Sequence, residues 1–443
     1  MTSLPGLKAE RDPACRVPGL SDEAVAVELS RVTTAEPTAI APPRRAAIAF
    51  IFVTVVLDVL ALGIVIPVLP KLVEDFVAGD TARAAQIVGV FGAVWALMQF
   101  ICSPILGALS DQFGRRPVIL LSTLGLGLDY FFMALAPSVG WLFVGRIISG
   151  ITASGFATAF AYIADVTRPE KRAEGFGIVG AAWGLGFVLG PALGGFLGDV
   201  DPRLPFWVAG SLTLLNTVYG VFVLPESLPR DRRECFTWRR ANPVGSLTLL
   251  RSHPELFGLA GVNFLYYVAH QVLPTVFVLY AGYRYAWGPR EVGFVLAGVG
   301  IANSLIQGWL IRPIVRRLGP RRTLLVGLLF GALGFSIYGL ASTGPTFLIG
   351  LPVFAFMGLF GPALQEVMTR HVSHSEQGKL QGANGAINAI SGLIGPLVFA
   401  TVFAAFIGPR RDLHLPGAPF LLASLLMMVA AVAAWRVTRR ESP

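Results

Sequence analysis

Long apolar runs separated by short polar stretches dominate the chain from residue 46 to residue 436. A helix rises 1.5 Å per residue, so about 20 apolar residues are needed to cross about 30 Å of hydrocarbon. The pattern therefore predicts an all-α membrane protein with twelve transmembrane helices. We expect them at residues 46–70, 85–108, 117–136, 139–163, 175–198, 204–224, 255–281, 290–312, 322–343, 345–367, 378–407 and 416–436.

Polar segments divide these runs into two sets of six. Residues 1–45 lack the apolar stretch of about 7–15 residues that a secretory signal requires, and we expect a disordered cytoplasmic tail there. Residues 225–254 are hydrophilic and rich in arginine, which predicts a cytoplasmic linker. The expected organisation is a six-helix bundle at 46–224, this linker, a second bundle at 255–436 and a cytoplasmic C-terminus at 437–443.

The basic residues predict which side of the membrane each loop faces. With the N-terminus inside, cytoplasmic loops and helix ends carry 23 Lys and Arg residues, and the outer loops carry 7. Such an excess marks the cytoplasmic side, so both termini are expected inside. The net charge of +9 follows from these helix-end residues and gives no reason to expect a nucleic-acid partner. The low charged fraction of 14%, against about 25% in soluble domains, agrees with a lipid-solvated chain.

Five small or helix-bending residues recur at one offset of 205 positions. They are Gly114, Gly177, Gly180, Gly190 and Pro191, which return as Gly319, Gly382, Gly385, Gly395 and Pro396. A repeat of six helices places the two copies parallel to one another, as in transporters built from two related halves.

A short motif occupies the loop between the second and third expected helices. It comprises Gly107, Asp111, Gly114, Arg115 and Arg116. Asp111 is expected to pair with Arg115 or to cap a helix N-terminus, and the basic pair anchors the inner face. The second copy has Arg316 where the aspartate would be, so an aspartate-based latch is expected in the N-terminal half only.

The fifth expected helix is unusually rich in glycine. Gly190, Pro191, Gly194 and Gly195 lie within it. Small residues four apart let helices approach closely, and an internal proline bends the helix by removing a backbone hydrogen bond.

Three charged residues stand out because they lie well inside the expected spans. Asp58 is near the middle of the first, and Asp129 and Arg146 lie at similar depth on the third and fourth. A charge at the bilayer centre costs about 2.5–3.5 kcal/mol on insertion scales, which favours a functional role over packing alone. Because two acids share one base, we expect Arg146 to neutralise one and the other to bind a proton. A purely structural buried ion pair is the alternative.

The C-terminal half offers uncharged polar candidates for substrate binding. They are His270, Gln271, Asn303, Gln307 and Gln365, and Asp58 and Asp129 join this set. Hydrogen-bonded packing is the competing interpretation for each. No metal-ligand set, no nucleophile–base set and no phosphate-binding loop appears, so we expect no metal, no enzyme activity and no direct ATP coupling.

Several motifs together resemble the major facilitator superfamily. The loop Gly107–Arg116 resembles its cytoplasmic signature, and Gly190-Pro191-Ala-Leu-Gly194-Gly195 resembles the antiporter signature of drug/proton exporters. Further matches resemble tetracycline/proton antiporters: Asp58 to Pro70, Leu128-Asp129-Tyr130, Gly145 to Thr152, Ile163-Ala-Asp165 and Pro362-Ala-Leu-Gln365. The resemblance implies that Asp58, Asp129 and Arg146 occupy functional polar positions. The chain departs from it in the ninth span, which has no acid and places Gly331 at the position we would align.

The expected function is therefore proton-coupled export of a drug-like amphipathic molecule, with tetracycline a candidate. We expect no cofactor. The proton is the expected coupling ion, and a divalent cation could accompany the substrate. We expect a monomer in a bacterial inner membrane, since one chain of this fold is sufficient for transport. An importer or uniporter on the same fold, and a non-transporting membrane receptor, are the alternatives.

Overall fold

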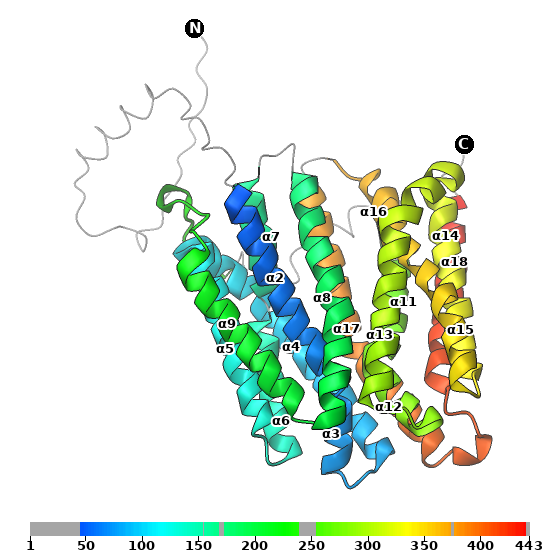
Figure 1. The fold of residues 1–443 in the computed structure, drawn as a ribbon. Helices are drawn as coiled ribbons and strands as arrows, with labels where there is room; N and C mark the ends of the chain where they lie inside the picture. The colour runs from blue at the N-terminus through cyan, green and yellow to red at the C-terminus, as the bar shows by residue number, and fades with distance from the viewer. Residues whose placement is uncertain (1–44, 154, 168–171, 239–253, 374–375, 440–443) are drawn as a thin grey trace, which may run out of the picture.

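The computed structural model describes residues 45–153, 155–167, 172–238, 254–373 and 376–439, and the described part is helical without strands (Figure 1). The N-terminal half contains α2 (Arg45–Val65), α3 (Leu69–Phe76), α4 (Thr81–Phe113), α5 (Arg115–Ala134), α6 (Val139–Thr152), α7 (Gly155–Val166), α8 (Arg172–Val200) and α9 (Leu204–Val223). The C-terminal half contains α11 (Pro254–His270), α12 (Val272–Tyr285), α13 (Pro289–Leu305), α14 (Ile311–Leu340), α15 (Gly344–Ala355), α16 (Phe360–Thr369), α17 (Gln377–Ile407) and α18 (Ala418–Arg439).

Ten helical stretches of the described chain are long and apolar enough to cross a bilayer. One of them, Pro289–Leu340, is 52 residues long and covers two expected spans. Gly319 interrupts it with non-helical angles, φ 76° and ψ 162°. The fourth expected span is divided between α6 and α7. The structure therefore shows a multi-pass helical membrane protein, whereas the count of twelve remains a prediction. The expected tail lies outside the described residues, as do 239–253 of the expected linker and 440–443 of the expected C-terminus.

Helix breaks recur at equivalent places in the two halves. α2 ends before Ile66 and the chain continues in α3, and α11 ends at His270 before Gln271 and α12. Ile66 and Gln271 are 205 residues apart, as are Gly114 and Gly319. Both glycines adopt a positive φ with an extended ψ, at 107° and 158° for Gly114, a region open essentially to glycine alone. The offset seen in the sequence thus reappears in the backbone.

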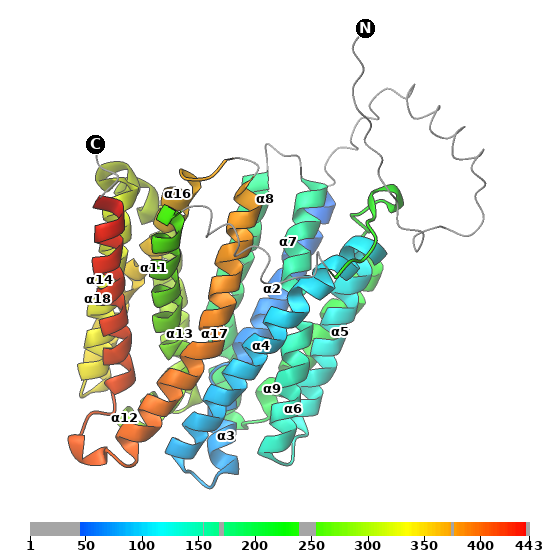
Figure 2. The same cartoon turned by 180° about the vertical axis from the view of Figure 1, so that it is seen from behind.

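The two halves touch mainly along two helix pairs, α4 with α17 and α8 with α13 (Figures 1 and 2), and α12 makes smaller contacts with α3 and α4. A Cβ placed on Gly89 of α4 would lie 2.8 Å from the carbonyl oxygen of Pro396 in α17. A Cβ on Gly195 of α8 would lie 3.0 Å from the Cα of Gly293 in α13. These approaches leave no room for a side chain, and small residues make them possible.

The opposite ends of α8 and α17 carry glycines with open space around them. α2 begins and α18 ends at that same end of the bundle (Figure 1). A Cβ built on Gly177 or Gly180 near the start of α8, or on Gly378 or Gly385 near the start of α17, would meet nothing within 4 Å. The halves are therefore closed together at one end of the bundle, while these four glycines near the other end have open space around them.

Candidate functional site

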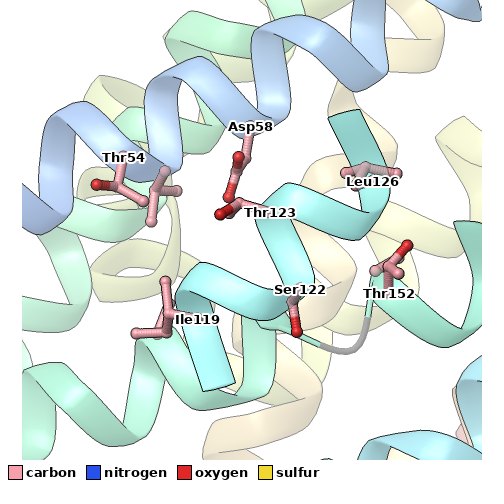
Figure 3. A pocket seen from close by; sticks show the side chains of 10 residues that line it. Thr54, Asp58, Ile119, Ser122, Thr123, Leu126 and Thr152 are labelled. Atoms are coloured by element: carbon pink, nitrogen blue, oxygen red, sulfur yellow. The ribbon is translucent and has the colours of Figure 1, made fainter. Parts of the chain in front are cut away.

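Asp58 lies in the middle of α2 and is held by a residue of α9. The Nδ2 group of Asn216 donates one hydrogen bond to Asp58 Oδ1 at 2.9 Å and another to the Thr54 carbonyl at 3.0 Å. Figure 3 shows the Asp58 carboxyl group directed toward α5, where Thr123 and Leu126 lie. Asp58 is thus an oriented carboxylate on the inner face of the N-terminal bundle.

Asp58 separates two adjoining pockets and lines both. The first is lined by hydroxyl-bearing and apolar side chains, namely Thr54, Val55, Ile119, Ser122, Thr123, Leu126, Thr152, Ala153 and Ala159 (Figure 3). The second brings Asp58 together with Arg146 and with aromatic side chains; its other lining residues are Leu62, Val65, Trp95, Leu126, Tyr130, Ser149 and Ala153. The structure therefore places the predicted Asp58 and Arg146 at one cavity.

Asp129 lies beside this cavity without lining it. Its side chain is 2% exposed, and neither carboxylate oxygen has a hydrogen-bond partner within the described chain. Oδ1 lies 3.2 Å from the place where a Cβ on Gly145 would stand, so the missing side chain of Gly145 makes room for the carboxyl group. A buried carboxyl group without partners is costly as an anion, so Asp129 differs in its surroundings from the hydrogen-bonded Asp58.

The expected neutralisation of one acid by Arg146 is not observed as an ion pair. No oxygen of Asp58 or Asp129 lies within 4.0 Å of a guanidinium nitrogen of Arg146. The guanidinium instead lies over the ring of Trp95, 5.6 Å from its centroid, a cation–π arrangement. Asp58 is engaged by Asn216, which the sequence did not single out. The available signal was that Asn216 is the only amide of α9, a helix whose other polar residues carry hydroxyl groups.

The loop motif forms a compact ionic cluster between α4 and α5. Arg115 Nη1 pairs with Asp111 Oδ1 at 2.5 Å, and Arg115 Nε pairs with Asp165 Oδ2 of α7 at 3.1 Å. The pairing expected for Asp111 is therefore present. At the offset of 205 residues, Pro320 stands where Arg115 does, so the second half has no counterpart of that arginine. Arg321, the counterpart of Arg116, donates from Nε to Thr438 of α18 at 3.0 Å.

Glu226, in the segment after α9, completes this cluster. Its two carboxylate oxygens accept the backbone N–H groups of Arg115 at 2.9 Å and Arg116 at 3.3 Å, the free donors at the start of α5. Arg116 donates from its side chain to the Val221 carbonyl at the end of α9. Sequence reasoning missed Glu226 because it was counted as part of the linker.

Gly107 joins this cluster through its backbone. Its carbonyl oxygen accepts a hydrogen bond from Ser110 Oγ at 2.7 Å, and that hydroxyl group accepts one from Arg115 Nη1 at 2.6 Å. A Cβ on Gly107 would meet nothing within 4 Å. The glycines of α8 serve two contacts. A Cβ on Gly190 would lie 2.7 Å from the Cα of Gly63 in α2, and Gly194 abuts the Ile64 carbonyl of the same helix. Gly195 and the carbonyl group of Pro191 face Gly293 of α13 instead. This motif therefore joins α8 both to its own half and to the other.

The polar candidates of the C-terminal half fall into separate groups. Gln307 donates to Asn303 at 3.1 Å across the junction of α13 and a five-residue π-helix, Ile306–Leu310. Gln365 belongs to a line of amides: Asn384 of α17 lies 3.5 Å from it, and Asn263 of α11 donates to Asn384 at 3.1 Å. These three amides come from three helices, and no sequence pattern connects them.

His270 and Gln271 lie where α11 meets α12. The His270 ring is 6.2 Å from the ring of Tyr266, which is stacked on Phe360 at 3.9 Å. Gln271 packs against α17, where a Cβ on Gly392 would lie 3.5 Å from its Nε2. None of these side chains lines the two pockets around Asp58.

Comparisons with known proteins agree with this arrangement. The family model of the Major Facilitator Superfamily matches residues 51–396 and 259–443. The class C tetracycline resistance protein of Escherichia coli is 39% identical over 352 residues, which cover 80% of this chain and 88% of that protein. Multidrug resistance protein 2 of Bacillus subtilis is 29% identical over 84% of this chain and 90% of that protein.

Solved structures share the fold. The human organic anion transporter MFSD10 (TETRAN) superposes with a TM-score of 0.66 at 25% identity, covering 89% of this chain and all of that one. The nucleoside transporter NupG superposes with a TM-score of 0.73 at 12% identity, covering 89% of this chain and 99% of that one, which bears on the fold alone. With the family match and the identity to tetracycline resistance proteins over most of its length, this chain belongs to the major facilitator superfamily.

Proposed function

We propose that this protein exports a drug-like amphipathic molecule in exchange for protons, with tetracyclines as the first substrates to test. The observation that carries the proposal is the shared cavity of Asp58 and Arg146, which places an acid and a base inside a lipid-solvated helix bundle. Intramembrane ionisable side chains that face a cavity mark substrate and proton pathways. The identity to tetracycline resistance proteins supports the direction and the class of substrate.

The proposed architecture has twelve spans in two six-helix halves, 46–224 and 255–436, with both termini in the cytoplasm of a bacterial cell. The recurring breaks at Ile66 and Gln271 and the recurring glycines support two parallel repeats. The end at which α2 begins is then cytoplasmic. Because the halves meet closely at the other end and glycines near this end have open space around them, we assign the structure to an inward-facing state.

In the proposed cycle Asp58 alternates between proton and drug. The deprotonated carboxylate, beside Arg146 and Trp95, binds the polar part of the substrate in the inward-facing state. After the halves rock to open outward, protonation of Asp58 removes its charge and releases the drug. Asp129, buried without a partner in the described chain, binds a proton in the same half, and return to the inward-facing state delivers protons to the cytoplasm.

The energetics are sufficient for a resistance function. One proton moving inward down a potential of 100 mV supplies about 2.3 kcal/mol, which supports roughly a fifty-fold gradient of drug. No further cofactor is part of the proposal. A divalent cation enters only as a companion of the substrate, and a monomer contains the whole pathway.

Drug accumulation in bacterial cells that produce the protein tests this function. Cells with the parent protein should accumulate less tetracycline than cells without it, and Asp58→Asn should abolish the difference. Dissipating the proton gradient with an ionophore should raise accumulation in the parent to the level of the variant. Equal accumulation with and without the parent protein, across a panel of amphipathic drugs, would contradict export.

A further inference from the structure

Asn216 of α9 is buried, with 1% of its surface exposed, and its amide is fixed by two acceptors of α2. One Nδ2 hydrogen goes to the Thr54 carbonyl at 3.0 Å and the other to Asp58 Oδ1 at 2.9 Å. A backbone carbonyl can only accept. If the amide turned over, its Oδ1 would face the Thr54 carbonyl, and that hydrogen bond would be lost whether Asp58 is ionised or protonated. Thr54 thus holds the donor of Asn216 toward Asp58 whatever the protonation state of the acid.

A donor held in this way distinguishes the two forms of the carboxyl group. Hydrogen bonds to an ionised acceptor are roughly twice as strong as those between neutral groups. Asn216 therefore stabilises the carboxylate of Asp58 more than the neutral acid. Its own Oδ1 has no partner in the described chain, so no second contact offsets this preference.

Other ionisable groups around Asp58 do not take over this role. Tyr130 of α5 and Arg146 of α6 line the second pocket with it, but neither is hydrogen-bonded to Asp58. Asp129 of α5 packs against Gly145. Elsewhere on the helices packed against α2 the described ionisable side chains have other contacts or lie far along the helix. They are Tyr162 and Asp165 of α7, Asp199 of α8 and Tyr219 of α9.

From this geometry we propose that Asn216 is the positioning residue that sets where Asp58 releases its proton. It keeps the acid deprotonated at cytoplasmic pH in the inward-facing state, so that an incoming drug meets a charged partner. Without the amide, Asp58 would retain its proton until a more alkaline pH. The inference rests on the proposed exchange of drug for protons but makes a claim about proton binding alone.

The experiment uses the purified full-length protein and reads proton binding and transport separately. The infrared carboxyl band that disappears in Asp58→Asn is titrated with pH in the absence of drug, and transport driven by a pH gradient is measured in proteoliposomes. The variants are Asn216→Leu, which removes both donors, and Asn216→Ser, which keeps a hydroxyl donor and a smaller volume. Thr213→Val is the matched control, because Thr213 is buried one turn away and donates only to Ala209 of its own helix.

In Asn216→Leu the midpoint of the Asp58 band should move to a higher pH by about one unit or more, and the pH optimum of transport should follow. Asn216→Ser should lie between this variant and the parent, and Thr213→Val should match the parent. An unchanged midpoint in Asn216→Leu, or in Asn216→Ala if the leucine variant does not fold, would overturn the inference, because neither side chain has a donor. Absence of transport in the parent would instead refute the proposed function, while the infrared titration would still decide the role of Asn216.

Discussion

Glu226 accepts the backbone N–H of Arg115 at 2.9 Å and thereby ties the end of α9 to the start of α5. This contact explains the glycine of the loop motif. A Cβ on Gly114 would lie 2.8 Å from the carboxyl carbon of Glu226 and 2.9 Å from Arg233 Nη2. Two features thus require a glycine at position 114: its backbone angles, and the space that Glu226 occupies beside it.

Gly114→Ala should therefore be more damaging than the same change at the equivalent position of the other half. Both sites have backbone angles that cost of order 1–3 kcal/mol for other residues. Only at Gly114 does the new methyl group meet a partner, since a Cβ on Gly319 has open space. We expect both variants to melt at a lower temperature than the parent, with the larger loss for Gly114→Ala, as measured by thermal unfolding in detergent.

The comparison of the two glycine variants has an internal control. Combining Gly114→Ala with Glu226→Gly should remove the clash but not the backbone strain. The melting temperature of the double variant should fall by less than the sum of the decreases in the two single variants. Equal melting temperatures for Gly114→Ala and Gly319→Ala would show that the Glu226 contact contributes nothing beyond backbone strain.

Asp129→Asn should impair proton-driven drug transport without lowering the thermal stability of the protein. The carboxyl group is buried and has no partner in the described chain, so a neutral amide of the same shape removes no ion pair. We expect thermal stability equal to or above that of the parent, because an unpaired buried charge is more costly than an amide. Proton-driven drug transport should nevertheless fall at least tenfold. A loss of about 3–5 kcal/mol in stability would instead indicate that Asp129 forms a buried ion pair.

The positions of the helices were predictable because each needs an apolar run, and apolar runs are visible in a single sequence. The division of the fourth span between α6 and α7, and the joining of two spans across Gly319, were not. Both depend on local backbone geometry within the bundle. The depth of Asp58, Asp129 and Arg146 in the membrane, which follows from helix rise, stays a prediction.

Gly89→Ala should destabilise the state in which this end of the bundle is closed. The new methyl group would press on Ala400 and on the Pro396 carbonyl, which lies 2.8 Å away and belongs to helix backbone that cannot move aside. Overpacking of this kind typically costs about 1–3 kcal/mol, here only in the state with this end closed. We expect transport to fall several-fold and a cysteine introduced beside the contact to react faster with a membrane-impermeant thiol reagent.

Gly261→Ala is the control for that experiment. Gly261 lies on α11, and a Cβ placed on it would meet nothing within 4 Å, so its substitution should leave both transport and thiol reactivity near the parent values. The proposed closure would be wrong if Gly89→Ala transported as fast as Gly261→Ala with unchanged reactivity.

Trp95 should affect drug binding through the aromatic character of its ring rather than through its volume. Arg146 lies 5.6 Å from the centroid, and such contacts are worth about 0.5–2 kcal/mol. Trp95→Leu should therefore raise the KM for drug by about two- to thirtyfold. Trp95→Phe, which keeps an aromatic face, should have the smaller effect. Identical KM values for the two variants in vesicle transport assays would argue against the cation–π contact.

The partners of the charged residues could not be predicted from the sequence. The similar depth of the three residues predicted that both acids would contact Arg146, but the direction of each side chain decides which contacts form. Arg146 lies over Trp95, and Asp129 packs against Gly145. Asp58 accepts a hydrogen bond from Asn216 of α9, which is 158 positions away in the chain. Glu226 was hidden for a similar reason, because nothing local distinguishes it from other acids of a polar segment.

Transport into inverted membrane vesicles tests proton-coupled export through Asp58 most directly. Vesicles that contain the parent protein are energised to an acidic interior, and accumulation of labelled tetracycline is followed beside vesicles with Asp58→Asn. We expect uptake by the parent that collapses when a protonophore removes the gradient, and none above background in the variant. Uptake by Asp58→Asn equal to that of the parent, with the same dependence on the gradient, would contradict this role of Asp58.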